Sequence, residues 1–108
     1  MARGTITPTQ GSRAGTTMIA ATTGDATNGH QVAYDSRVGI LAKNTGATSH
    51  TITFLPSRLV DGQSTAGRVE TLAAGETQLF SGFDTADYGT TLRVDVNHAE
   101  ITIQAIRL

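Results

Sequence analysis

Three histidines, a few separated carboxylates and scattered serines are the residues of this chain that could carry out catalysis or bind a metal. His30, His50 and His98 each stand apart in sequence from a second plausible ligand. An isolated histidine near a turn or strand end is more often a surface or capping residue than a metal ligand or general base. The chain also lacks cysteine, a G-x-S-x-G motif and a glycine-rich phosphate loop before a helix. The sequence therefore predicts that the protein is not an enzyme, with no catalytic residue, bound metal or cofactor.

Two acidic stretches offer oxygen ligands, but neither has the spacing of a cation site. Asp25-x-x-Asn28 lacks the alternating acidic positions and the terminal glutamate of an EF-hand calcium loop. Asp84 and Asp87 could be taken as a metal pair, yet aspartates in such turn-rich loops usually cap or stabilise turns. We expect structural roles for these residues.

Length and composition predict one small domain with a thin core. Only 23 of the 108 residues are Leu, Ile, Val or Phe, but a net charge of −1 gives no repulsion that would keep the chain expanded. Small cores are supplemented by disulfides, metals or association, and the absence of cysteine leaves association as the favoured route.

The same composition disfavours two classes of partner. The N-terminus has no continuous apolar region of a signal peptide, and no segment approaches the about 18 apolar residues of a membrane span. We therefore expect synthesis in the cytoplasm and no membrane partner. Near-neutral charge with scattered arginines also argues against a nucleic-acid partner.

Alternating apolar and polar residues predict short strands separated by turns rich in Gly, Thr and Asn. We expect one strand in 14–22 and three hairpins, formed by 37–54, by 68–72 with 77–80, and by 92–96 with 101–106. The loop 81–89 should place Phe83 and Tyr88 over an end of the core. The predicted fold is an all-β sandwich of about seven or eight antiparallel strands, Greek-key or jelly-roll-like, with the hairpins 37–54 and 92–106 contributing central strands.

Residues 1–13 are predicted to form an extended N-terminal arm ahead of a sandwich domain at 14–108. The segment is polar and has no apolar periodicity, so it cannot order itself alone. It could lie along its own domain as an edge strand, or against another polypeptide. We predict the second arrangement, with Arg3, Thr5, Thr7 and Arg13 contacting the partner, and we expect the domain to fold without the arm.

Several short motifs follow one another in a recognisable order between residues 37 and 108. They are Lys43-Asn44-Thr45-Gly46, Leu72-Ala73-Ala74-Gly75-Glu76-Thr77, Gly82-Phe83 and Ala105-Ile106-Arg107. This order resembles the small β-sandwich head proteins of tailed bacteriophages, in which a KNTG hairpin, a PAGET turn, a GPF loop and an AIR end recur. The chain departs from that pattern where Leu72-Ala73-Ala74 replaces a common proline and Ser81-Gly82-Phe83 replaces Gly-Pro-Phe, and residues 1–36 match no motif of the group.

The resemblance implies a capsid decoration, or cement, protein that binds the outside of an assembled head and stabilises it. Its partner would be the major capsid protein, its own oligomer a homotrimer, and its final location the virion exterior after synthesis in the host cytoplasm. A host-surface or glycan-binding module displayed on a virion is the alternative function. An enzyme domain is the third, which the lack of a catalytic motif disfavours.

Overall fold

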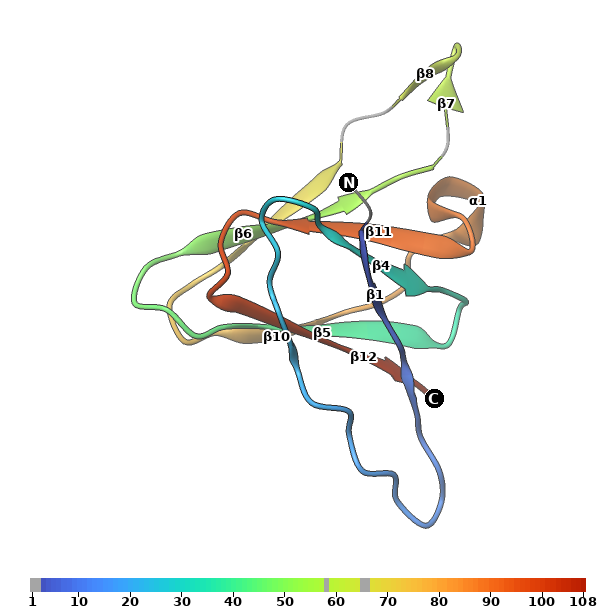
Figure 1. The fold of residues 1–108 in the computed structure, drawn as a ribbon. Helices are drawn as coiled ribbons and strands as arrows, with labels where there is room; N and C mark the ends of the chain where they lie inside the picture. The colour runs from blue at the N-terminus through green and yellow to red at the C-terminus, as the bar shows by residue number, and fades with distance from the viewer. Residues whose placement is uncertain (1–2, 58, 65–66) are drawn as a thin grey trace.

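The computed structural model describes residues 3–57, 59–64 and 67–108, which form an almost entirely β structure (Figure 1). The strands are β1 (Gly4–Ile6), β2 (Thr9–Gln10), β3 (Thr22–Thr23), β4 (His30–Ala33), β5 (Val38–Asn44), β6 (His50–Leu55), β7 (Leu59–Val60), β8 (Gln63–Ser64), β9 (Arg68–Leu72), β10 (Thr77–Phe80), β11 (Thr91–Val96) and β12 (Ile101–Arg107). One turn of helix, α1 (Thr85–Tyr88), lies between β10 and β11. No helix among the described residues has the length and apolar character needed to cross a bilayer.

Eight antiparallel strands form the framework of two packed sheets. One sheet has the order β4-β11-β6-β9, and the other has the order β10-β5-β12 with β3 paired to the far side of β12. Two sheets of four strands whose connections pass repeatedly from one sheet to the other are a jelly roll. The predicted all-β sandwich is therefore confirmed, and the runs 37–54 and 92–106 supply interior strands of both sheets.

The three predicted hairpins are wrong, although their strand positions are right. The members of each pair, β5 with β6, β9 with β10, and β11 with β12, lie in different sheets and do not hydrogen-bond to each other. Their connecting loops 45–49, 73–76 and 97–100 are arches that cross the core at one end of the sandwich, on the left of Figure 1. The second strand of a hairpin pairs with the first in the same sheet, about 4.8 Å away, whereas the second strand of an arch lies in the facing sheet, about 10 Å away. In both cases the same alternate side chains face the core. The apolar pattern therefore could not distinguish an arch from a hairpin.

Asn44, which the sequence places in a turn, is the buried last residue of β5 and joins these arches. Its side-chain Nδ2 donates to the backbone oxygens of Thr48 (2.7 Å) and Leu72 (3.0 Å), and its Oδ1 accepts from the amide of Gly46 (2.9 Å). Its backbone amide also donates to the carbonyl of Glu76. One buried amide side chain thus satisfies polar groups in the first arch and at the end of β9.

The core consists of the inward-facing residues of both sheets. Burial alternates along β6, β11 and β12 as the sequence pattern requires. Phe80, Phe83 and Tyr88 are partly buried and pack against this cluster. The predicted position of Phe83 and Tyr88 over an end of the core is confirmed, although a turn of helix replaces part of the expected loop. β6 ends at Leu55, directly before Pro56, which cannot donate to a sheet.

The N-terminal segment is docked on its own domain. β1 pairs in parallel with β4, and β2 pairs in parallel with β12, so the segment adds one strand to each sheet. Ile6 is only 5% exposed and belongs to the hydrophobic core, and Thr9 is also buried. This is the edge-strand arrangement, and whether the domain folds without the segment stays a prediction. Whether the segment also contacts another polypeptide stays a prediction.

Two parts of the chain extend from the sandwich. The segment 11–21 is exposed throughout and extends at the bottom of Figure 1, whereas the hairpin β7–β8 extends at the top. The predicted strand 14–22 is wrong, because only Thr22–Thr23 pairs, with β12. The alternating residues of 14–21 are mostly alanine and threonine, which offer little apolar area for burial. The strand β4 and the hairpin β7–β8 were not predicted.

Candidate functional site

The side of the jelly roll bounded by β9 and β10, which we call the open side, presents the longest unpaired edges among the described strands. β9 pairs only with β6 and β10 only with β5, and the arch 73–76 joins them. At the opposite side, the edges are β1, β2 and β3, with three, two and two residues. Very short edge strands offer little template for pairing, whereas β9 and β10 have five and four residues. The open side is therefore where an added strand would find backbone partners.

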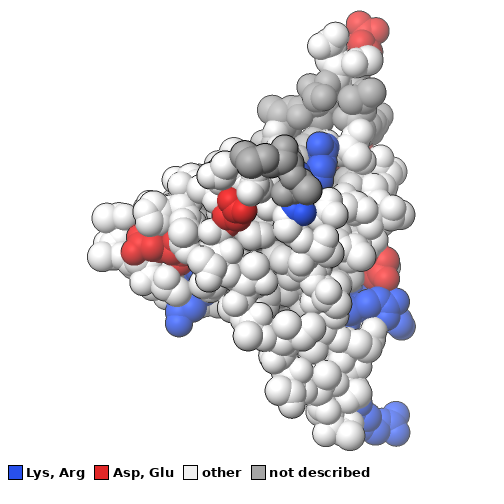
Figure 2. All heavy atoms as spheres, in the orientation of Figure 1, with Lys and Arg blue, Asp and Glu red and all other residues white. Residues whose placement is uncertain are grey.

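Exposed apolar side chains occur on the same two edge strands. Val69 of β9 is 58% exposed and Leu79 of β10 is 56% exposed. Met18 and Ile19 are further exposed apolar residues, in the segment 11–21. Figure 2 shows small, separated groups of acidic and basic side chains on the face drawn, with uncharged surface between them. The described residues of the face drawn therefore carry no large patch of a single charge.

A groove of about 580 Å³ opens where the start of β9 and the end of β10 meet the loop containing α1. Its lining residues are Arg68, Glu70, Leu79, Phe80, Ser81, Gly82, Phe83, Asp84, Asp87 and Tyr88. The rings of Phe83 and Tyr88 pack edge to face at 4.9 Å, and the Tyr34 hydroxyl donates to the Phe83 carbonyl. Burial raises the pKa of that hydroxyl above its usual value. Phe83 and Tyr88 therefore line the groove in positions held by their packing against the core.

The four residues predicted to contact a partner do not form one cluster. The Arg3 guanidinium lies 2.5 Å from Asp95 Oδ1 and also donates to the carbonyl of His30, so it is engaged within its own chain. Thr5 is exposed in β1, and its hydroxyl accepts from the Gln31 side chain. Thr7 and Arg13 are exposed, Thr7 between β1 and β2 and Arg13 in the segment 11–21.

The two acidic stretches have the structural roles expected of them. Asp25 Oδ1 accepts the amides of Thr27 and Asn28, and these hydrogen bonds hold the pKa of the carboxyl below its usual value. Asp84 caps α1 by accepting the amide of Ala86 at 2.8 Å.

His30 is buried, and its Nε2 accepts the amide of Asp25 at 2.9 Å. Burial, together with the nearby charge of Arg3, lowers the pKa of His30 despite the opposing effect of Asp25 and Asp95. The structure therefore favours the neutral imidazole, in a structural role at the start of β4.

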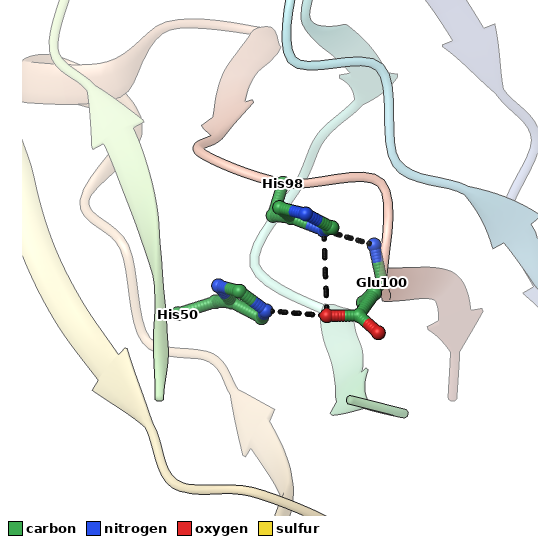
Figure 3. A group of neighbouring side chains, drawn as sticks. All are labelled: His50, His98 and Glu100. Carbon is green, nitrogen blue, oxygen red and sulfur yellow. Dashed lines mark hydrogen bonds and ion pairs between the residues drawn. The ribbon is translucent and has the colours of Figure 1, made fainter. Parts of the chain in front are cut away.

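The other two histidines are brought together with a glutamate (Figure 3). His50 Nε2 lies 2.8 Å from Glu100 Oε1, and His98 Nδ1 lies 3.5 Å from the same oxygen. The two imidazole rings are stacked, with centroids 4.4 Å apart and planes 11° from parallel. His50 is the buried first residue of β6, while His98 and Glu100 come from the arch 97–100. We call this group the His50–His98–Glu100 cluster.

The sequence did not predict this cluster, because its members are far apart in the chain. His50 and Glu100 are separated by 50 positions, and their meeting depends on the packing of two arches. The pair His98-x-Glu100 was a local signal, but two ligands alone are not typical of a metal site.

Comparisons with models of known protein families, with characterised proteins and with solved structures gave no match to this chain.

Proposed function

We propose that this chain is a capsid decoration protein that binds the outside of an assembled bacteriophage head and stabilises it, with the major capsid protein as its partner. The observation that carries the proposal is the open side, where β9 and β10 leave the edges of both sheets unpaired and each carries an apolar side chain more than half exposed. The motif resemblance within residues 37–108 supports the same function.

The open side suits attachment to a repeated protein surface. An extended segment of a partner can add a strand to an exposed edge through main-chain hydrogen bonds. Exposed side chains such as Leu79 would then make apolar contacts with that segment. On a capsid, many copies bind at equivalent positions, and if the copies are themselves joined as oligomers, weak individual contacts add to a stable attachment. The protein would then stabilise the head by binding the assembled state in preference to its separate subunits.

A glycan-binding module is the second candidate, and the groove beside α1 is the observation in its favour. Aromatic rings and carboxylates line this groove, and jelly rolls occur both in viral capsid proteins and in lectins. However, Phe83 and Tyr88 pack against each other and against the core, so their faces are largely occupied. The groove supports this function less strongly than the open edges support protein binding.

The test is sedimentation of the purified chain with heads assembled from the major capsid protein encoded in the same genome. We expect the wild-type chain to sediment with these heads. Leu79→Lys should weaken attachment because it places a charge on the β10 edge, whereas Ala47→Lys, at an exposed position of the arch 45–49, should not. Both variants should keep the β circular dichroism spectrum, because both positions are exposed.

The outcomes separate the competing arrangements. Failure of the wild-type chain to bind heads would contradict the proposed function, and binding to a glycan array instead would favour the second candidate. If Arg13→Ala or Thr7→Lys abolished attachment while Leu79→Lys did not, the capsid would contact the N-terminal segment and not the open side.

A further inference from the structure

The His50–His98–Glu100 cluster has the composition of a metal centre, and the proposed attachment to capsids does not use it. We propose that these three residues bind a divalent transition-metal ion, with Zn²⁺ as the ion that fits best. Two imidazoles and one carboxylate are a known ligand set for zinc, which takes a water as its fourth ligand. Hard cations such as Mg²⁺ prefer oxygen ligands and should not compete.

The distances in the cluster are close to those of a tetrahedral site. Zinc bonds of about 2.0–2.1 Å imply ligand atoms about 3.4 Å apart around the metal. His98 Nδ1 and Glu100 Oε1 are 3.5 Å apart, and His50 Nε2 and Glu100 Oε1 are 2.8 Å apart. All three ligand atoms lie within 4.8 Å of one another. Small side-chain movements would therefore bring them to the separations that the ion needs.

Hydrogen bonds in the cluster also identify the atoms that would bind. His50 Nε2 lies 2.8 Å from Glu100 Oε1, and an ion between these two atoms would take the place of a proton there, which the neutral imidazole would carry on its Nδ1 instead. His98 Nδ1 accepts the amide of Glu100 at 3.1 Å, so it already carries a lone pair. The ion would take that lone pair, and the exposed amide could then donate to water.

One rearrangement is required, and the exposed partner can make it. The lone pairs of two stacked imidazoles run side by side and do not converge on one point, so one ring must tilt. The side chain of His50 is only 9% exposed and is held by its surroundings, whereas that of His98 is 51% exposed. His98 is thus the residue that moves onto an ion held first by His50 and Glu100.

The backbone around the cluster is already held in place. The amide and hydroxyl of Thr45 donate to the Glu100 carbonyl at 2.9 and 2.7 Å, and the amide of Asn97 donates to the Thr51 carbonyl. Gly46 lies so close to the Glu100 carboxylate that a side chain there would displace it.

The position of the cluster gives the ion a structural effect. His50 begins β6 in one sheet, and Glu100 directly precedes β12 in the other, so the ion would join the two sheets at the end where the arches cross. A metal is one of the supplements that small domains use, and this chain has no cysteine for a disulfide. Binding to the folded state alone would raise its stability.

The test is thermal unfolding and titration calorimetry of the chain without any histidine tag, because a tag would itself bind zinc. Micromolar Zn²⁺ should raise the melting temperature and give a binding isotherm of one ion per chain, and Mg²⁺ should do neither. Co²⁺ should give the visible absorption bands of a tetrahedral site. His98→Ala and Glu100→Gln should weaken zinc binding by more than the about 10- to 100-fold that follows loss of an outer-shell partner.

Two controls distinguish the cluster from other sites on the chain. Glu70→Gln, which removes a carboxylate outside the cluster, should leave zinc binding unchanged. Gly46→Ala should weaken zinc binding without removing a ligand, because it displaces Glu100. The proposal is overturned if the wild-type chain shows no zinc-dependent change in melting temperature, or if His98→Ala and Glu100→Gln both bind zinc as tightly as the wild type.

Discussion

Replacing Ile6 with alanine tests whether the N-terminal segment is part of the core. Ile6 lies in β1, pairs with Val32 of β4 and is 5% exposed in the hydrophobic cluster. Truncation of a buried isoleucine to alanine costs about 2–5 kcal/mol, depending on how far the surroundings collapse. β1 is a three-residue edge strand that can move inward, so we expect the lower part of that range, about 2–3 kcal/mol.

Urea and thermal unfolding followed by circular dichroism would measure this loss. In a domain of this size, a loss of about 2 kcal/mol lowers the melting temperature by roughly 10 °C. Thr5→Ala is the matched control, because Thr5 is the preceding residue of the same strand but is exposed, and it should change stability by less than about 0.5 kcal/mol. Deleting residues 2–10 should cost more than Ile6→Ala, because it also removes both parallel pairings and the ion pair of Arg3 with Asp95.

Equal stability of Ile6→Ala and Thr5→Ala would refute this reasoning. The segment would then not pack in the core in solution, and the arrangement in which it lies against another polypeptide would be favoured instead.

Three further predictions concern pH, a buried amide and association. Because burial lowers the pKa of His30 below the ordinary 6.5, the unfolded chain takes up that proton first, so the free energy of unfolding should fall as pH drops below about 6.5. His30→Gln should flatten this part of the pH profile measured by urea unfolding; an unchanged slope would show that His30 is not responsible. Asn44→Ala should lower the free energy of unfolding by about 3 kcal/mol in the same assay, because it leaves the carbonyls of Thr48 in the first arch and of Leu72 in β9 without a donor. Asn97→Ala, at an exposed position with one such hydrogen bond, should lower it by about 1 kcal/mol. Equal losses would contradict the role of Asn44 in joining the arch to β9. Sedimentation at micromolar concentration should show a homotrimer, and a stable monomer would contradict the argument from the thin core.

The sequence alone determined where β5, β6 and β9 to β12 lie, and which side chains of β6, β11 and β12 face inward. The predicted strands 68–72 and 77–80 agree with β9 and β10 at both ends. In the last third of the chain, Leu92 and Val94 of β11 and Ile101 and Ile103 of β12 are buried as their alternation requires. This information is local, because the two-residue period of a strand fixes which side chains share a face whatever the strand pairs with.

Only the tertiary structure decided which strands are neighbours. Turn residues such as Asn44 and Gly46 suit a hairpin, yet the Asn44 side chain instead joins an arch to the end of β9. The docking of Ile6 depends on a space between the sheets that exists only after they have packed. Likewise, His50 meets Glu100 only because two arches cross at the same end of the core. Such contacts join residues far apart in the chain, so their stability comes from the assembled sandwich and not from any local pattern.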